Sequence, residues 1–144
     1  MTKAEIIAFI NANLDGYLAT VEGNKPHVRV IRMVKADENG VIIQTNTYKD
    51  VYKQLSANPN VELCFFNAKD DIQIRVSGTV EPVDDRELKD EIITQRPFLK
   101  PQVEKGGYGA IAVYRLKGMA TVWIRKTSFD PKTHTQFPKT YVQL

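Results

Sequence analysis

Hydrophobic and polar positions along the chain predict a protein built mainly from short β-strands. The alternation is cleanest over residues 72–82, where apolar side chains occupy one face and polar side chains the other. A strand is also expected at 60–67, and the segment 16–46 predicts three strands joined by hairpin turns at 22–24 and 37–40. Because tight turns join consecutive strands into antiparallel sheets, the expected class is mainly β with peripheral helices.

Three segments carry helical periodicity instead. Residues 3–13 place apolar side chains on one broad stripe, 48–57 end just before a proline, and 84–95 turn Leu88, Ile92 and Ile93 to one side. The stretch 97–109 is rich in proline and glycine, so we predict a loop there.

The C-terminal part predicts a closing hairpin over residues 108–126 that turns at Lys117–Gly118. After Ser128 the chain becomes polar and carries prolines, which predicts an extended tail that packs on a partner subunit or remains mobile. So many antiparallel strands favour a small closed or partly closed barrel plugged by helices. We expect one domain over residues 1–144, with an N-terminal helix at 1–14 and the tail at 128–144.

Composition and charge narrow the class of function. The chain is 42% hydrophobic and 26% charged, as in an ordinary globular protein. Its short, interrupted apolar runs predict neither a membrane span nor a signal peptide, and its single cysteine suits a reducing compartment, so we expect a cytoplasmic protein. A net charge of +3 permits anionic ligands but does not indicate nucleic acid. His27 and His134 lack ligand spacing, so no metal site is expected.

The start of the second helix is the most informative local feature. Thr47 and Asp50 have the spacing of a capping box, which predicts a helix beginning at Tyr48 with Lys49 in its first turn. A cation is unfavourable there by about 0.3–1 kcal/mol unless an anion binds beside it. With Lys53 one turn on and an arginine from a neighbouring strand, a phosphate cradle is one interpretation. The other interpretation is that Asp50 neutralises the helix end and both lysines are simply solvated.

A longer pattern favours the first interpretation. Four segments, taken in their order along the chain, resemble the pyridoxamine 5′-phosphate oxidase-like family of FMN-binding split barrels. They are R-x-x-x-M-V, ENG-V-I-I-x-T-N, K-Q-L-x-x-N-P-x-V and Q-I-R-V-S-G-T-V-E. The similarity runs from about Gly16 to Asp85, and more loosely through GMATVWI near the C-terminus. The resemblance implies a six-stranded antiparallel split barrel of Greek-key type. It also implies a homodimer that binds FMN at the subunit interface.

The resemblance also implies which residues hold the cofactor. Arg29 matches the arginine that holds the FMN phosphate, and the next two residues match positions whose backbone follows the flavin ring. Thr45 and its neighbours match residues near the phosphate or ribityl chain, while Gln73 matches a glutamine that reaches the flavin. Trp123 either stacks on the flavin or packs at an interface. The predicted cofactor-binding residues are Arg29, Val30, Ile31, Gln44, Thr45, Asn46, Lys49, Lys53, Gln73 and Trp123.

Two departures from the family pattern bear on function. Many relatives carry Ser-Arg-Lys where this chain has Lys49, Asp50 and Val51, so Lys49 is expected to replace the usual phosphate lysine. The C-terminal part also lacks the arginine–histidine motif that grips the phosphate of pyridoxamine 5′-phosphate, so that substrate is not expected.

The expected function is therefore that of an FMN-dependent oxidoreductase acting with a small-molecule electron donor or acceptor, for which no catalytic side chain is named. A non-catalytic flavin- or haem-binding module of the same fold is the alternative. A nucleic-acid-binding or partner-binding barrel is a third interpretation, which the mild net charge disfavours.

Overall fold

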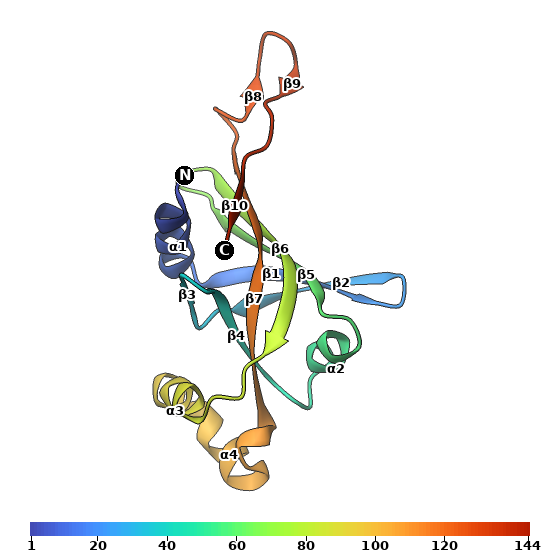
Figure 1. Ribbon diagram of the computed structural model, residues 1–144, viewed down its shortest axis with the longest axis vertical. Helices are drawn as coiled ribbons and strands as arrows, with labels where there is room; N and C mark the ends of the chain where they lie inside the picture. Colours follow the sequence, from blue (N-terminus) through green and yellow to red (C-terminus); the bar gives the residue numbers. More distant parts are fainter.

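Antiparallel β-structure dominates the computed structural model, which describes all residues 1–144 (Figure 1). The elements follow the chain in the order α1 (Lys3–Ala12), β1 (Asp15–Glu22), β2 (Lys25–Arg32), β3 (Lys35–Asp37), β4 (Gly40–Asn46), α2 (Asp50–Ala57), β5 (Asn60–Asn67), β6 (Ile72–Pro82), α3 (Arg86–Gln95), η1 (Pro97–Leu99), α4 (Lys100–Gly106), η2 (Tyr108–Ala110), β7 (Ile111–Ile124), β8 (Phe129–Asp130), β9 (Thr135–Gln136) and β10 (Tyr141–Gln143).

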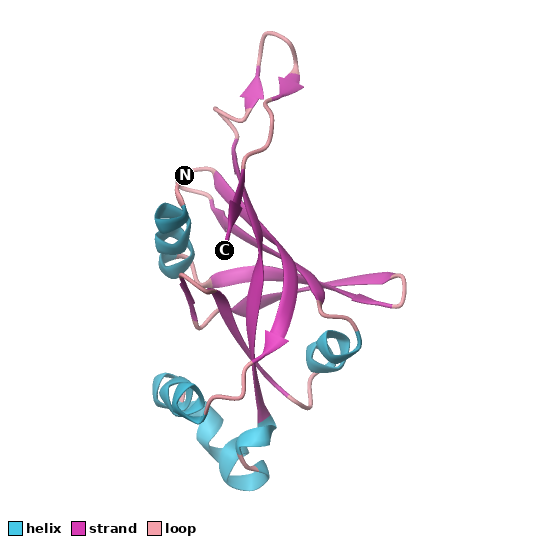
Figure 2. Ribbon diagram, viewed as in Figure 1, coloured by secondary structure: helices cyan, strands magenta, loops and turns pink.

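Strands make up the body of the molecule, and the helices lie at its periphery (Figure 2). The main sheet has eight strands in the order β2-β1-β5-β6-β7-β4-β3, with β10 paired to β7. All of these pairs are antiparallel, which confirms the mainly β class. Six of the strands are long, and the short β3 and β10 account for the two beyond the six that the resemblance implied. The connections from β4 to β5 and from β6 to β7 carry the helices α2, α3 and α4.

The predicted closing hairpin at Lys117–Gly118 is wrong. Residues Ile111–Ile124 form one 14-residue strand, β7, which pairs with β6 from Ile72 to Pro82 without a turn. Gly118 lies opposite Gly78, and a Cβ on Gly118 would stand 2.2 Å from the Ser77 carbonyl oxygen. The glycine therefore serves a close approach of two backbones rather than a turn.

Residues 16–46 form four strands rather than the predicted three. The second predicted strand breaks at Met33–Val34, between β2 and β3. The Met33 N–H donates to the Leu14 carbonyl at 2.8 Å, whereas the Val34 N–H donates to Ile42 at 2.9 Å. The chain thus leaves one edge of the sheet and joins the other at this point, while both side chains stay buried.

The segment 97–109, predicted as a loop, is largely helical. Pro97 and Pro101 each stand in the first turn of a short helix, where a missing N–H costs no hydrogen bond. Leu99 is completely buried, which anchors this segment to the body of the protein. Gly107 ends α4 with a positive φ of 73°.

Two apolar clusters form the core. The larger packs α1 and α2 against the inner face of the sheet around Leu63, Phe65 and Ile74. The smaller packs α3, η1 and α4 against the opposite face of β4 and β7, around Ile42 and Ile92. The predicted helices at 3–13 and 84–95 are confirmed, with Thr2 and Glu5 forming a capping box on α1 and Asp85 capping α3.

The C-terminal tail is only partly as predicted. Residues 129–136 form the small β8–β9 hairpin, which projects from the body of the molecule (Figure 1). The chain then returns, β10 pairs with β7 at Met119–Thr121, and Leu144 is buried. The last residues therefore belong to the main sheet. None of the helices is both long enough and apolar enough to cross a membrane.

Candidate functional site

Arg29 lies at the centre of a polar cluster that joins β1, β2 and α2. Its guanidinium donates to the Leu18 carbonyl at 3.1 Å, to the Thr20 hydroxyl at 2.8 Å and to the side-chain oxygen of Gln54. The Thr20 hydroxyl in turn donates to Gln54 at 2.6 Å, and both of these residues are buried. These contacts engage three of the five N–H groups of the guanidinium, so two remain for a ligand. Burial lowers the Arg29 pKa, which the nearby Asp50 carboxylate partly offsets.

His27 belongs to the same cluster, although sequence reasoning weighed it only as a metal ligand. It stands two residues before Arg29, so its side chain is on the same face of β2, opposite Thr20. Its Nε2 atom is buried and has no hydrogen-bond partner. A buried polar atom without a partner is costly, which makes His27 a further candidate for ligand binding.

The predicted start of α2 is wrong by two residues. The helix begins at Asp50, and Lys49 is its N-cap residue without a side-chain capping bond. Thr47 is therefore two residues too early to cap the helix, and its hydroxyl donates to the Ala110 carbonyl at 3.4 Å. Lys49 thus stands just outside the first turn, and Asp50 complements the helix dipole. Lys49 and Lys53 are both exposed, and the bond from Arg29 to Gln54 places this helix beside the arginine.

The three predicted residues on β4 are buried, and two of them, Gln44 and Asn46, belong to a second polar group. Gln44 donates to Asn46 at 3.1 Å and accepts a 3.1 Å bond from Arg96. Arg96 also donates to the carbonyls of Arg32 and Met33, both at 3.0 Å. Burial, together with the nearby Arg32, lowers the Arg96 pKa. Thr45 is equally buried but points to the other face of the strand.

Sequence reasoning missed Arg96, because the chain after α3 was predicted to be a loop. Its guanidinium holds the Met33–Val34 break between β2 and β3 and orients Gln44 at the same time. The available signal was an arginine directly after the apolar stripe of a helix and directly before Pro97.

Gln73 and Trp123 are direct partners across β6 and β7. They line a cavity of about 310 Å³ together with Arg75, Gln136 and Lys139. Arg75 pairs with Glu62, and this bond raises the Arg75 pKa. Two of the predicted cofactor-binding residues are thus neighbours in the structure.

Val30 lies on the same outer face of the sheet as Gln73 and Trp123, whereas Ile31 packs inward. The strand registers align one row across six strands: Val30, Tyr17, Cys64, Arg75, Thr121 and Tyr141. Large apolar side chains are exposed on this outer face at Tyr17, Val28, Val30, Phe66, Met119 and Tyr141. Eight of the ten predicted residues therefore fall into three groups: a cluster beside α2, a buried pair on β4, and this outer face. The other two, Ile31 and Thr45, point inward.

The sequence profile of the pyridoxamine 5′-phosphate oxidase family matches residues 2–123, which is most of the chain. The protein belongs to the pyridoxamine 5′-phosphate oxidase family. This family member is 35% identical over 82 residues to the pyridoxine/pyridoxamine 5′-phosphate oxidase of Burkholderia mallei. That match covers 56% of this chain but only 38% of the enzyme.

Solved structures of the same fold extend over nearly the whole chain. A NimC/NimA family protein from Clostridium acetobutylicum is 30% identical, with a TM-score of 0.73 over 98% of this chain and 92% of its own. HutZ, the heme storage protein from Vibrio cholerae, is 18% identical, with a TM-score of 0.61 over 86% of this chain and 95% of its own. The second of these shows a shared fold alone.

Membership of the pyridoxamine 5′-phosphate oxidase family confirms the resemblance described for the sequence. The cofactor-binding role of the ten predicted residues stays a prediction, now with a defined geometry. Arg29 contacts α2 through Gln54, Gln73 lies opposite Trp123, and Gln44 accepts from Arg96 and donates to Asn46.

Proposed function

We propose that this protein is a single-domain FMN-dependent oxidoreductase that acts as a cytoplasmic homodimer on a substrate other than pyridoxamine 5′-phosphate. The observation that carries the proposal is the polar cluster around Arg29 beside α2. A half-buried guanidinium with two spare donors contacts α2 through Gln54, and the Asp50 carboxylate at the start of this helix is near enough to offset part of the effect of burial on the Arg29 pKa. This combination suits a phosphate dianion.

The unpartnered Nε2 atom of His27 supports the same assignment. A phosphate oxygen bound by Arg29 would give this buried atom the partner that it lacks. Exposed Lys49 and Lys53 add positive charge on the open side of the cluster. The residues present therefore fit the phosphate end of FMN. When bound, FMN supplies the electron-carrying isoalloxazine, and the chain supplies binding and orientation.

The outer face of the sheet supports the homodimer. Its exposed apolar side chains surround Gln73 and Trp123, which is typical of a surface that a partner covers. A stable dimer buries about 1,000 Å² from each protomer, and this chain exposes 8640 Å². In such a dimer, one side of the flavin ring would contact Gln73 and Trp123 of one subunit. The other side of the ring would contact the partner subunit.

The flavin is expected to be reduced by a small-molecule electron donor such as a nicotinamide nucleotide. Adding FMN to the purified protein should give the absorption spectrum of a bound flavin and should start steady oxidation of NAD(P)H. A protein whose spectrum and NAD(P)H oxidation match those of free FMN would contradict the proposal.

A non-catalytic flavin- or haem-binding module is the second candidate. The observation in its favour is the similarity of the fold to a heme storage protein over most of both chains. Titration with haemin separates the two candidates: a Soret band that shifts on stoichiometric binding, without NAD(P)H oxidation in the presence of FMN, would favour the module.

A further inference from the structure

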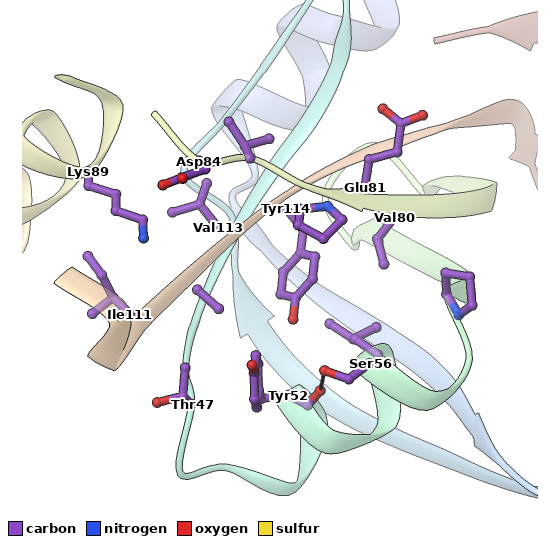
Figure 3. Close-up of a pocket in the computed structure, with 16 residues that line it drawn as sticks. Thr47, Tyr52, Ser56, Val80, Glu81, Asp84, Lys89, Ile111, Val113 and Tyr114 are labelled. Atoms are coloured by element: carbon purple, nitrogen blue, oxygen red, sulfur yellow. Dashed lines mark hydrogen bonds between the residues drawn. The ribbon is translucent and has the colours of Figure 1, made fainter. Parts of the chain in front are cut away.

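A cavity of about 540 Å³ lies beside α2 (Figure 3). The helix lines it with Tyr52, Leu55 and Ser56, whereas Gln54, which bonds to Arg29, is not part of the lining. The cavity lies between α2, the end of β6, the start of β7 and the side chain of Lys89 on α3. Its volume is within the range of small-molecule sites. None of the ten residues predicted to bind the cofactor lines it. The proposed function therefore leaves this cavity without a role.

Lys89 gives one end of the cavity a positive charge. Only 9% of this lysine is exposed, and its ammonium group points toward Ile111 and Val113 in Figure 3. Its Nζ donates to the Tyr108 carbonyl at 3.2 Å, and it forms none of the ion pairs in the protein. Two N–H donors of the ammonium group thus remain for an anion. An anionic ligand in the cavity would supply the counter-charge that none of the ion pairs provides.

The carbonyl that holds Lys89 is itself fixed. The guanidinium of Arg86 stacks over the Tyr108 ring at 3.9 Å, and the Tyr108 hydroxyl donates to Asp90. Both partners come from α3, the helix that carries Lys89. These contacts between Tyr108 and α3 therefore keep the Tyr108 carbonyl close to Lys89.

The remainder of the cavity is largely apolar. Its walls come from Leu55, Val80, Pro82 and Val113, among other residues, and the ring of Tyr114 stands in the middle. Burial raises the Tyr114 pKa, so its hydroxyl stays neutral over the physiological range. Flat apolar groups suit such walls, and a neutral hydroxyl offers them one polar contact.

We propose that this cavity binds a planar aromatic monocarboxylate, with the carboxylate on Lys89 and the ring system against the apolar walls. One ammonium group with two free donors matches a single carboxylate better than a phosphate dianion, which requires more donors. The two acidic residues of the lining, Glu81 and Asp84, form no ion pair with Lys89. Glu81 pairs with Lys117 at 3.2 Å, and Asp84 is exposed to solvent.

The test uses 2-naphthoate as the probe and 2-naphthamide as its neutral analogue, without added FMN. Titration followed by amide chemical shifts should give saturable binding of 2-naphthoate, with the largest shifts at Ile111, Val113 and Tyr114. The amide should bind at least tenfold more weakly. Absence of saturable shifts up to millimolar probe, or equal affinity for acid and amide, would overturn the proposal.

Lys89→Met keeps the aliphatic chain and removes the charge. It should weaken 2-naphthoate binding at least tenfold and leave the affinity for 2-naphthamide unchanged. Lys105→Met, which removes an exposed lysine from α4, is the matched control and should change neither affinity. Unchanged 2-naphthoate binding in folded Lys89→Met, or shifts centred on Gln73 and Trp123, would refute the assignment. Should Lys89→Met not fold, the comparison of acid and amide in the unmodified protein still decides. Because no step needs FMN, the outcome is independent of the flavin proposal.

Discussion

Gly118→Ala tests the close contact that keeps β6 and β7 paired through their centres. A Cβ on Gly118 would lie 2.2 Å from the Ser77 carbonyl oxygen and 2.8 Å from the Gly78 Cα atom. Because both neighbours are backbone atoms, rotation of a side chain cannot relieve the clash. The two strands must move apart where Gly78 and Gly118 face each other.

Overpacking of this kind typically costs about 1–3 kcal/mol, and we expect the upper half of that range because backbone has to move. For a domain of this size, about 3 °C of melting temperature is lost per kcal/mol, which predicts a fall of roughly 6–9 °C. Thermal unfolding followed by circular dichroism measures it.

Gly109→Ala is the matched control, because a Cβ at Gly109 meets no atom within 4 Å and its φ is not positive. It should melt within about 2 °C of the unmodified protein, as surface substitutions do. A Gly118→Ala protein as stable as the Gly109→Ala control would refute the close contact, and with it the continuous β7 strand.

Three further predictions follow from the outer face and the family comparison. Tyr17→Asp puts a charge on the proposed interface and should shift the sedimentation coefficient from that of a dimer to that of a monomer at micromolar concentration. Phe98→Asp, at an exposed residue of η1, should leave the coefficient unchanged. A stable monomer before any substitution would contradict the dimer. Trp123→Ala should weaken FMN binding about 2- to 13-fold, equivalent to the 0.5–1.5 kcal/mol of an aromatic stack, and unchanged flavin fluorescence would leave Trp123 as packing alone. The FMN-loaded protein should not oxidise pyridoxamine 5′-phosphate at ordinary enzyme rates, and pyridoxal 5′-phosphate formed at such rates would contradict this.

Local patterns predicted most of the fold. The alternation over 72–82 and the apolar stripe of α1 each reflect a single element with one buried face, so periodicity identifies them directly. The errors occur where distant backbone decides the outcome. Lys117–Gly118 has the composition of a turn, but its glycine is needed because Gly78 lies opposite. The break at Met33 depends on carbonyls of Leu14 and Ile42, which no local pattern reveals.

The candidate site was predictable to a similar extent. The family pattern predicts that Arg29 and Gln73 bind the cofactor, which stays a prediction, and the structure adds the residues that each of them contacts or faces. Arg96 and His27 were missed because their importance comes from burial and contacts, not from spacing along the chain. The capping prediction at Thr47 failed because the Thr47 N–H donates to the Ala110 carbonyl, 63 residues away in the sequence, and the helix begins only at Asp50 with Lys49 as its N-cap residue.

The most direct test of the flavin proposal compares the affinities of FMN and riboflavin by fluorescence quenching in the unmodified protein, Arg29→Ala and Lys49→Ala. Arg32→Ala is the matched control, because Arg32 is an exposed arginine on the same strand that pairs with Asp15. We predict that FMN binds clearly better than riboflavin, and that Arg29→Ala removes most of this difference. Lys49→Ala should remove less of it, because that lysine is solvated, and Arg32→Ala should leave it unchanged. Equal affinity for FMN and riboflavin in the unmodified protein would contradict the phosphate site at Arg29, and with it the central claim.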